Sequence, residues 1–155
     1  MKLTDEWFTA IAESEEGNDT IFVSGRCAID EFRCSGKFRE RAEVTWRYDA
    51  DSKGMPDEAT ATLMEDVMAT LRRAMEKNKL AILTGVYTGG GERNMIFYTR
   101  NIPAFGNTLN EALMPYELLP LTIYTEKDAD WSEYAEMCVL RSDDVDDMVD
   151  DEDVL

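Results

Sequence analysis

The stretch Leu80–Arg100, LAILTGVYTGGGERNMIFYTR, decides how the rest of the chain is arranged. Two runs rich in β-branched and aromatic residues, 80–88 and 95–99, flank three consecutive glycines at 89–91. Such runs joined by a short glycine-rich piece predict an antiparallel hairpin, because glycine adopts the positive φ angles of tight turns without strain. A phosphate-binding loop would lead from a strand into a helix, whereas these glycines lead into a second strand.

Helical patterns lie on both sides of this hairpin. The first begins at Pro56, and its apolar residues recur on one helical face: Met64, Met68, Leu71 and Met75. A methionine stripe of this kind favours core packing over an adaptable binding groove. Residues 101–114 predict the second helix, formed best from Ala104.

Strands complete the pattern on the outer sides of these helices. Alternating apolar residues at 43–48 and 119–123 predict one strand before the first helix and one after the second. From Glu43 the order is therefore strand, helix, strand, strand, helix, strand. This order predicts a ferredoxin-like α+β sandwich, a split β-α-β repeat with both helices on one face of an antiparallel sheet. We also expect extra strands at 6–12 and 20–25 and a short C-terminal helix.

These patterns predict one α+β domain over residues 1–141 and an acidic tail over 142–155. Within the domain, the N-terminal strands occupy 1–37, the ferredoxin-like core 38–126 and the short helix 129–138. Asp130 is predicted to cap that helix, because Glu133 follows it at the spacing of a capping box. The tail has little to bury, so we expect it to be disordered or loosely helical.

The charge of the chain is strongly acidic. Sixteen Lys and Arg face 33 Asp and Glu, a net of −17, and the body before residue 142 keeps 25 acids against 16 bases. Such a surface repels the phosphate backbone and argues against direct nucleic-acid binding, whereas it attracts a basic protein partner. Solubility alone also explains the charge. No run of apolar residues is long enough to cross a membrane, which indicates a soluble cytoplasmic protein.

The residue inventory argues against catalysis, metals and cofactors. The chain has no histidine, which removes the commonest general base and metal ligand. Cys27, Cys34 and Cys138 form neither a disulfide framework nor a zinc site. Cys27-x5-Arg33 matches the spacing of cysteine phosphatases but lacks their glycines and carries two acids. Asp128-x-Asp130 has carboxylates but not the ligand spacing of a calcium loop.

One set of residues remains as a candidate binding patch for an anion or carbonyl group. It combines arginines and aromatic side chains of the hairpin with a later tryptophan: Tyr87, Arg93, Tyr98, Arg100 and Trp131. Tyr98 and Arg100 are two residues apart and should share one face of their strand. Trp131 and Tyr134 either line an aromatic pocket or fasten the last helix to the sheet, and the second reading is favoured.

Several spaced motifs resemble the bacterial domain of unknown function 695 family. They run in order as Trp46-Arg47-Tyr48, Gly54–Glu58, Leu83–Gly89, Phe97–Arg100, Leu119-Pro120 and Asp130-Trp131-x-x-Tyr134. The likeness covers about Arg41 to Met137 and implies a ferredoxin-like fold similar to that of the acidic ribonuclease E regulator B, which acts by binding an enzyme. It implies no activity and no catalytic residue.

We therefore expect a non-catalytic binding or regulatory module that acts through protein–protein contacts. The alternative is a small-molecule or anion binder, or a minor enzyme, using the tyrosine and arginine patch. A third possibility is a homodimer formed through the sheet face opposite the two helices. The most useful observation is what fills that face. A dry core would indicate a purely structural role, a lined cavity would indicate a ligand, and an exposed apolar patch would indicate a partner.

Overall fold

The computed structural model describes residues 1–13 and 19–141, so the predicted acidic tail lies outside the described residues. The elements follow in the order β1 (Trp7–Glu13), β2 (Thr20–Arg26), α1 (Asp30–Cys34), β3 (Glu40–Arg47), α2 (Glu58–Glu76), β4 (Ala81–Gly89), β5 (Glu92–Thr99), α3 (Ile102–Leu113) and β6 (Leu121–Lys127). A last helix covers residues 132–141. Among the helices of these ranges, none combines the length and apolarity needed to cross a bilayer.

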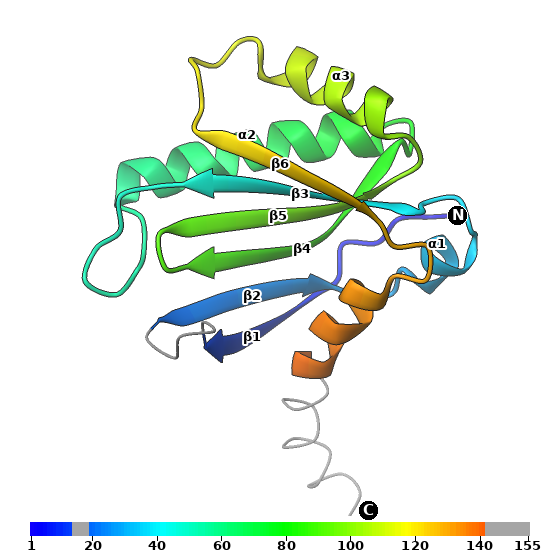
Figure 1. Ribbon diagram of the computed structural model, residues 1–155, viewed down its shortest axis with the longest axis horizontal. Helices are drawn as coiled ribbons and strands as arrows, with labels where there is room; N and C mark the ends of the chain where they lie inside the picture. Colours follow the sequence, from blue (N-terminus) through cyan, green and yellow to red (C-terminus); the bar gives the residue numbers. More distant parts are fainter. Residues whose placement is uncertain (14–18, 142–155) are drawn as a thin grey trace, which may run out of the picture.

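The strands form one six-stranded antiparallel sheet in the order β1-β2-β4-β5-β3-β6 (Figure 1). Strands β3 to β6 with α2 and α3 make the split β-α-β arrangement, which confirms the predicted ferredoxin-like α+β fold. The predicted N-terminal strands form a hairpin that pairs through β2 with β4. Because of this pairing, β4 is an inner strand, and β1 instead forms the edge of the sheet on this side.

Local sequence signals explain where the central elements begin and turn. Asp57 caps α2, because its side chain accepts a hydrogen bond from the amide of Thr60. Asn101 caps α3 in the same way through Ala104, so this helix begins at Ile102, within the predicted range 101–114. The β4–β5 turn has positive φ angles at its glycines, 60° at Gly90 and 83° at Gly91, which confirms their predicted role as turn residues.

Helices α2 and α3 cover one face of the sheet. Met64, Val67, Leu71 and Met75 of α2 are buried, which confirms the predicted apolar face. They pack over residues of the inner strands, namely Ala42, Val44, Trp46, Leu83, Val86, Met95 and Phe97. Phe105 of α3 closes this layer with an edge contact to Phe97 at 5.4 Å between ring centroids.

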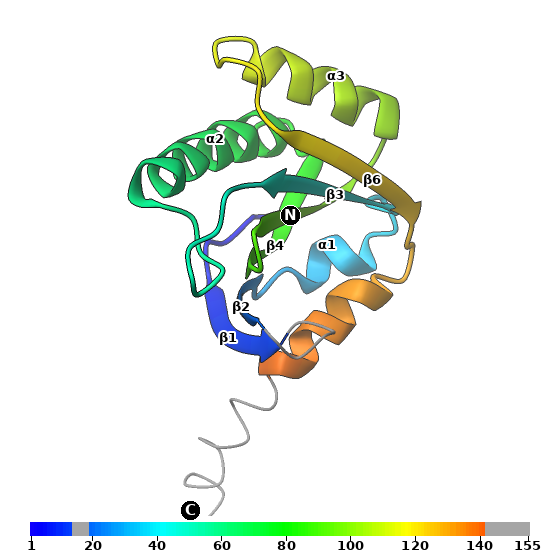
Figure 2. The ribbon, with the colours of Figure 1, turned by 60° about the vertical axis from the view of Figure 1, so that its left-hand side comes forward.

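The opposite face carries a second core under α1 and helix 132–141 (Figure 2). Trp131 is fully buried and stacks on Tyr98 at 4.3 Å between ring centroids. Its indole Nε1 donates to the carbonyl of Phe38, and the Tyr134 hydroxyl donates to the carbonyl of Arg26. Trp131 and Tyr134 therefore fasten the last helix to the sheet, which is the favoured interpretation of these residues, and this helix covers part of the face opposite α2 and α3.

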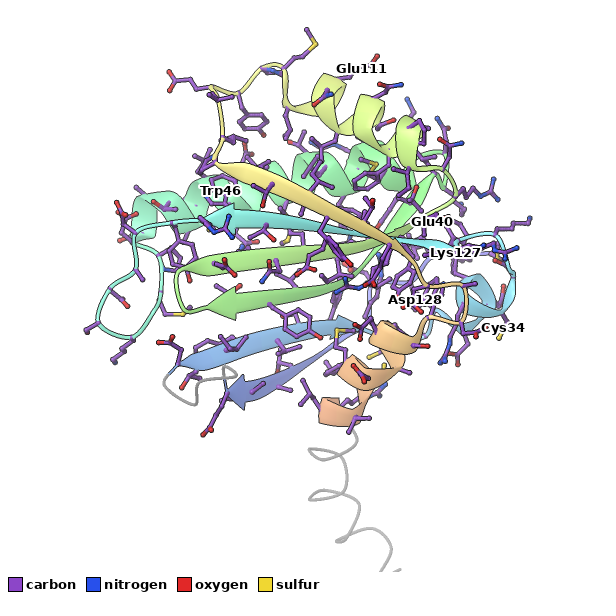
Figure 3. All side chains as sticks on the ribbon, in the orientation of Figure 1. Cys34, Glu40, Trp46, Glu111, Lys127 and Asp128 are labelled. Carbon is purple, nitrogen blue, oxygen red and sulfur yellow. The ribbon has the colours of Figure 1, made fainter. Side chains whose placement is uncertain are left out.

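The cap of this last helix differs from the prediction. Asp128 lies just before this helix (Figure 3). Its carboxylate, not that of Asp130, accepts hydrogen bonds from the amides of Ser132 and Glu133. It also accepts one from the Tyr98 hydroxyl at 2.7 Å. The prediction that Asp130 caps this helix is wrong. The hydrogen bond from Tyr98 on β5 holds Asp128 at the first turn of the helix, and a rule based on local sequence spacing does not include such a long-range contact.

Candidate functional site

The five residues predicted as one binding patch lie in four different places. Tyr98 and Trp131 are buried in the second core, and Arg100 is exposed with its guanidinium 5.3 Å from the ring centre of Phe38. Tyr87 lines a groove on that same face, whereas Arg93 lies in a groove on the face of α2. The structure therefore brings Tyr98 and Trp131 together and separates Arg93 from them. Arg93 and Tyr98 are an odd number of residues apart on β5, so they point to opposite faces.

The first groove, here called the acidic groove, lies where α1 and helix 132–141 leave the second sheet face uncovered. Its volume is about 470 Å³, within the range of ligand-binding clefts. Strands β1 to β5 all contribute to it, through Ala12, Glu13, Ile21, Arg41, Glu43, Tyr87, Gly89, Glu92, Asn94 and Ile96. A lined groove, the feature that would indicate a ligand, is thus present on this face next to the second core.

Arg41 is the central charge of the acidic groove. Its side chain is 11% exposed, and Nη1 donates to carboxylates of Glu43 at 3.3 Å and Glu126 at 3.1 Å. Burial alone would lower the pKa of Arg41, but these carboxylates raise it overall, so the guanidinium stays charged. Its Nε is buried with no hydrogen-bond partner among the described residues. A group with a free oxygen acceptor would satisfy that donor.

Carboxylates outnumber cations around this groove. The pKa of Glu133 is raised because its carboxyl hydrogen-bonds that of Glu136, and the charges of Arg41 and Glu126 also act on it. Burial raises the pKa of Tyr87 to about 12, so its hydroxyl is neutral at physiological pH. Two crowded acids beside a neutral phenol favour a positively charged ligand.

The second groove, here called the arginine groove, lies between α2 and the β1–β2 hairpin, and its volume is about 410 Å³. It is lined by Asp5, Trp7, Phe22, Ser24, Met55, Glu65, Met68, Arg72, Leu83, Val86, Thr88 and Arg93. Two guanidinium groups thus face an apolar floor. Sequence reasoning selected Arg93 but missed Trp7, Phe22 and Arg72, which come from elements far apart in the chain.

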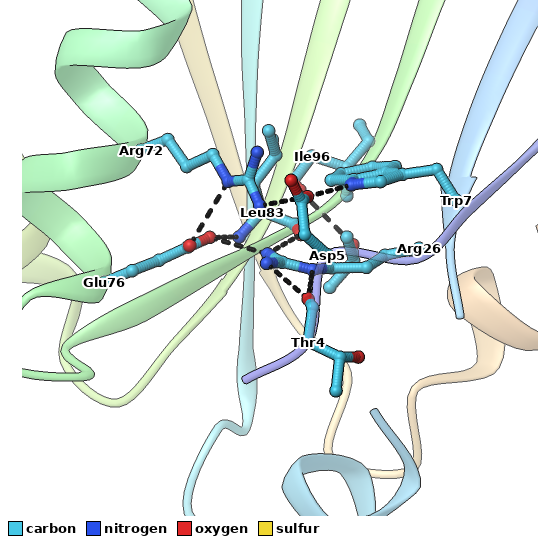
Figure 4. A network of polar contacts seen from close by, with 9 residues as sticks. Thr4, Asp5, Trp7, Arg26, Arg72, Glu76, Leu83 and Ile96 are labelled. Carbon is cyan, nitrogen blue, oxygen red and sulfur yellow. Dashed lines mark hydrogen bonds and ion pairs between the residues drawn. The ribbon is translucent and has the colours of Figure 1, made fainter. Parts of the chain in front are cut away.

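A network of buried polar contacts supports one end of the arginine groove (Figure 4). Arg26 is 2% exposed, and its Nη1 lies 2.8 Å from Glu76 Oε2. The same guanidinium donates to the carbonyls of Thr4 and Leu83, while Glu76 Oε2 accepts from the amide of Leu83. Leu83 adjoins the β-bulge in the β4–β5 pairing, so this ion pair satisfies backbone groups there.

Comparison with known proteins identifies the family. The chain belongs to the family of unknown function DUF695, whose model matches residues 5–138. The matched range includes every residue that lines either groove, as well as Trp131 and Tyr134. No curated protein and no solved structure gave a significant match.

Proposed function

We propose that the protein is a binding module without catalysis of its own, which takes a basic, extended segment of a partner protein in the acidic groove. The observation that supports it is the charge balance around the groove. Among the described residues that line the groove, Arg41 is the one base, and it pairs with the carboxylates of Glu43 and Glu126. The acids that line or adjoin the groove are Glu13, Glu43, Glu92, Glu126, Glu133 and Glu136.

A lysine or arginine side chain in the groove would relieve two unfavourable features at once. It would offset the repulsion between the neighbouring carboxylates of Glu133 and Glu136, which contributes to the raised pKa of Glu133. A main-chain carbonyl of the same segment would accept from the unpartnered Nε of Arg41. The net charge of −17 would attract a basic partner over a longer range and speed its association.

The compartment that suits this role is the reducing cytoplasm. Cys27, Cys34 and Cys138 form no disulfide in the described part of the chain, as is usual for thiols of that compartment. A bacterial cytoplasm is the setting we propose, and a basic protein of that compartment is the proposed partner class.

The experiment uses a short fluorescein-labelled peptide of alternating lysine and alanine and the full chain. Binding is followed by fluorescence anisotropy at low and high salt. We expect the Glu43→Gln, Glu133→Gln double variant to bind the peptide roughly tenfold more weakly, as two partly shielded charge contacts are lost. The matched control is Glu111→Gln, an exposed acid on α3 in the opposite layer (Figure 3).

The control separates a groove from general charge. If Glu111→Gln weakens binding as much as one groove substitution does, only the overall charge attracts the peptide and the proposal fails. Wild-type affinity in the double variant would also refute it. Deleting residues 142–155 removes eight acids and should slow association at low salt, with little effect on the dissociation rate.

A further inference from the structure

We propose that the arginine groove binds a small amphipathic anion, an organic carboxylate or phosphate with a flat apolar body. This site lies on the opposite sheet face from the acidic groove, so it is independent of the function proposed above. A single cross-strand row carries the inference. Ile11 pairs with Phe22, Phe22 with Thr88, and Thr88 with Arg93.

The row changes steadily in chemical character. Ile11 and Phe22 are large apolar side chains that are 65% and 46% exposed. The apolar residues that β3, β4 and β5 place in the core on the same face are buried. Next comes the hydroxyl of Thr88, and then the guanidinium of Arg93. Directly paired residues share a face, and neighbouring strands are about 4.8 Å apart, so Phe22 and Arg93 lie roughly 10 Å apart at their backbones. An apolar ring with one anionic group has this length and this polarity.

Arg93 is held in place to receive the anion. Its Nε donates to Thr88 Oγ1 at 3.0 Å, and its Nη1 lies 2.9 Å from Glu65 Oε1. The Arg93 side chain is 12% exposed, whereas that of Glu65 is 62% exposed. An ion pair with so exposed a partner adds little stability, so a ligand anion can displace that carboxylate. No bond within the described residues engages Nη2, which leaves the guanidinium free to bind the anion at two points.

Helix α2 and the start of β1 provide the opposite wall. Glu65, Met68 and Arg72 follow at helical spacing on one face of α2, so Met68 lies between the two charged ends of the groove. The Arg72 guanidinium lies 5.4 Å from the ring centre of Trp7. Asp5 accepts hydrogen bonds from both Trp7 and Arg72, which shows that this end of the groove already holds a carboxylate.

The experiment measures binding of three probes to the full chain by changes in its NMR spectrum. The probes are 2-naphthoate, 2-naphthyl phosphate and neutral 2-naphthylmethanol. We expect both anions to bind and to shift the signals of Phe22 and Thr88, with the neutral analogue at least roughly tenfold weaker. Tighter binding of the naphthoate would identify the natural ligand as a carboxylate, and tighter binding of the phosphate as a phosphate ester.

Two variants test the two halves of the site separately. Arg93→Met should weaken both anions roughly tenfold and leave the neutral analogue unchanged, whereas Phe22→Ser should weaken all three probes. Arg100→Met is the control, since this arginine lies on the other face against Phe38. Absence of anion binding, or equal losses for Arg100→Met and Arg93→Met, would overturn the proposal. Because Phe22 is partly exposed, the Phe22→Ser result stands even if Arg93→Met fails to fold.

Discussion

The buried pair of Arg26 and Glu76 tests how the N-terminal hairpin is held to the rest of the domain. Their charged atoms lie 2.8 Å apart, and their side chains are 2% and 12% exposed. We expect Glu76→Gln to lower the free energy of unfolding by about 3 kcal/mol, because breaking a buried ion pair leaves an uncompensated charge. The value lies at the low end for such pairs, since glutamine keeps an oxygen for the amide of Leu83.

The reverse substitution should cost more. Arg26→Met removes the charge and also leaves the carbonyls of Thr4 and Leu83 without their donor, so we expect a loss of about 4 kcal/mol. The double variant with Glu76→Gln should lose about 5 kcal/mol, less than the sum of the single losses. Each single change already breaks the same pair, so the two effects cannot be additive.

Urea unfolding followed by tryptophan fluorescence and circular dichroism provides the measurement. The control is Glu92→Gln, whose partner Arg47 lies 3.2 Å away with both side chains well exposed. We expect that control to change stability by less than about 1 kcal/mol. If Glu76→Gln costs no more than Glu92→Gln, or if the double variant is additive, the network does not hold the hairpin in the way described.

Two further predictions concern stability and its dependence on pH. Gly106→Ala should stabilise α3 by up to about 1 kcal/mol, because its added Cβ contacts nothing within 4 Å, whereas Gly25→Ala should cost about 2 kcal/mol because its Cβ meets the Phe8 ring at 2.2 Å. Thermal melting of both variants checks this pair, and a stabilised Gly25→Ala would contradict it. Burial would raise the pKa of Asp128, but hydrogen bonds from Tyr98 and two amides outweigh it and lower that pKa. The resulting stability is complete above about pH 4 and is lost as the pH falls through the lowered value. Asp128→Asn should therefore flatten the acid limb of a melting-temperature profile, and an unchanged limb would show that another carboxyl controls it.

The central elements were predictable because their signals are local. The apolar face of α2 appears as a helical period, and the glycines at 89–91 mark the turn between β4 and β5. Helix α1 was not predicted, because it has only five residues and one buried side chain, Phe32. Its position depends on packing against Phe38, 5.7 Å away between ring centroids, and no short window of sequence contains that contact.

The candidate sites were predictable only in part, because they depend on irregular and distant features. Strict alternation from Leu83 would put Val86 on the opposite face, yet both lie in the core under α2 because a bulge shifts the register of β4. Arg26 ends a strand, a position typical of surface residues. Its burial depends on Glu76, fifty residues later in the chain, so sequence alone gave no reason to place it inside.

The second core also sets an order for folding. Trp131 bonds to Phe38 across 93 residues, and Tyr134 bonds to Arg26 across 108 residues. During synthesis the strands that these side chains cover therefore leave the ribosome long before their cover does. Contacts of such long range slow folding, because the chain must close a large loop before they form. A ribosome-bound chain that ends before Trp131 would thus expose apolar surface of β2, β4 and β5, and such surface favours aggregation until the last helix is made.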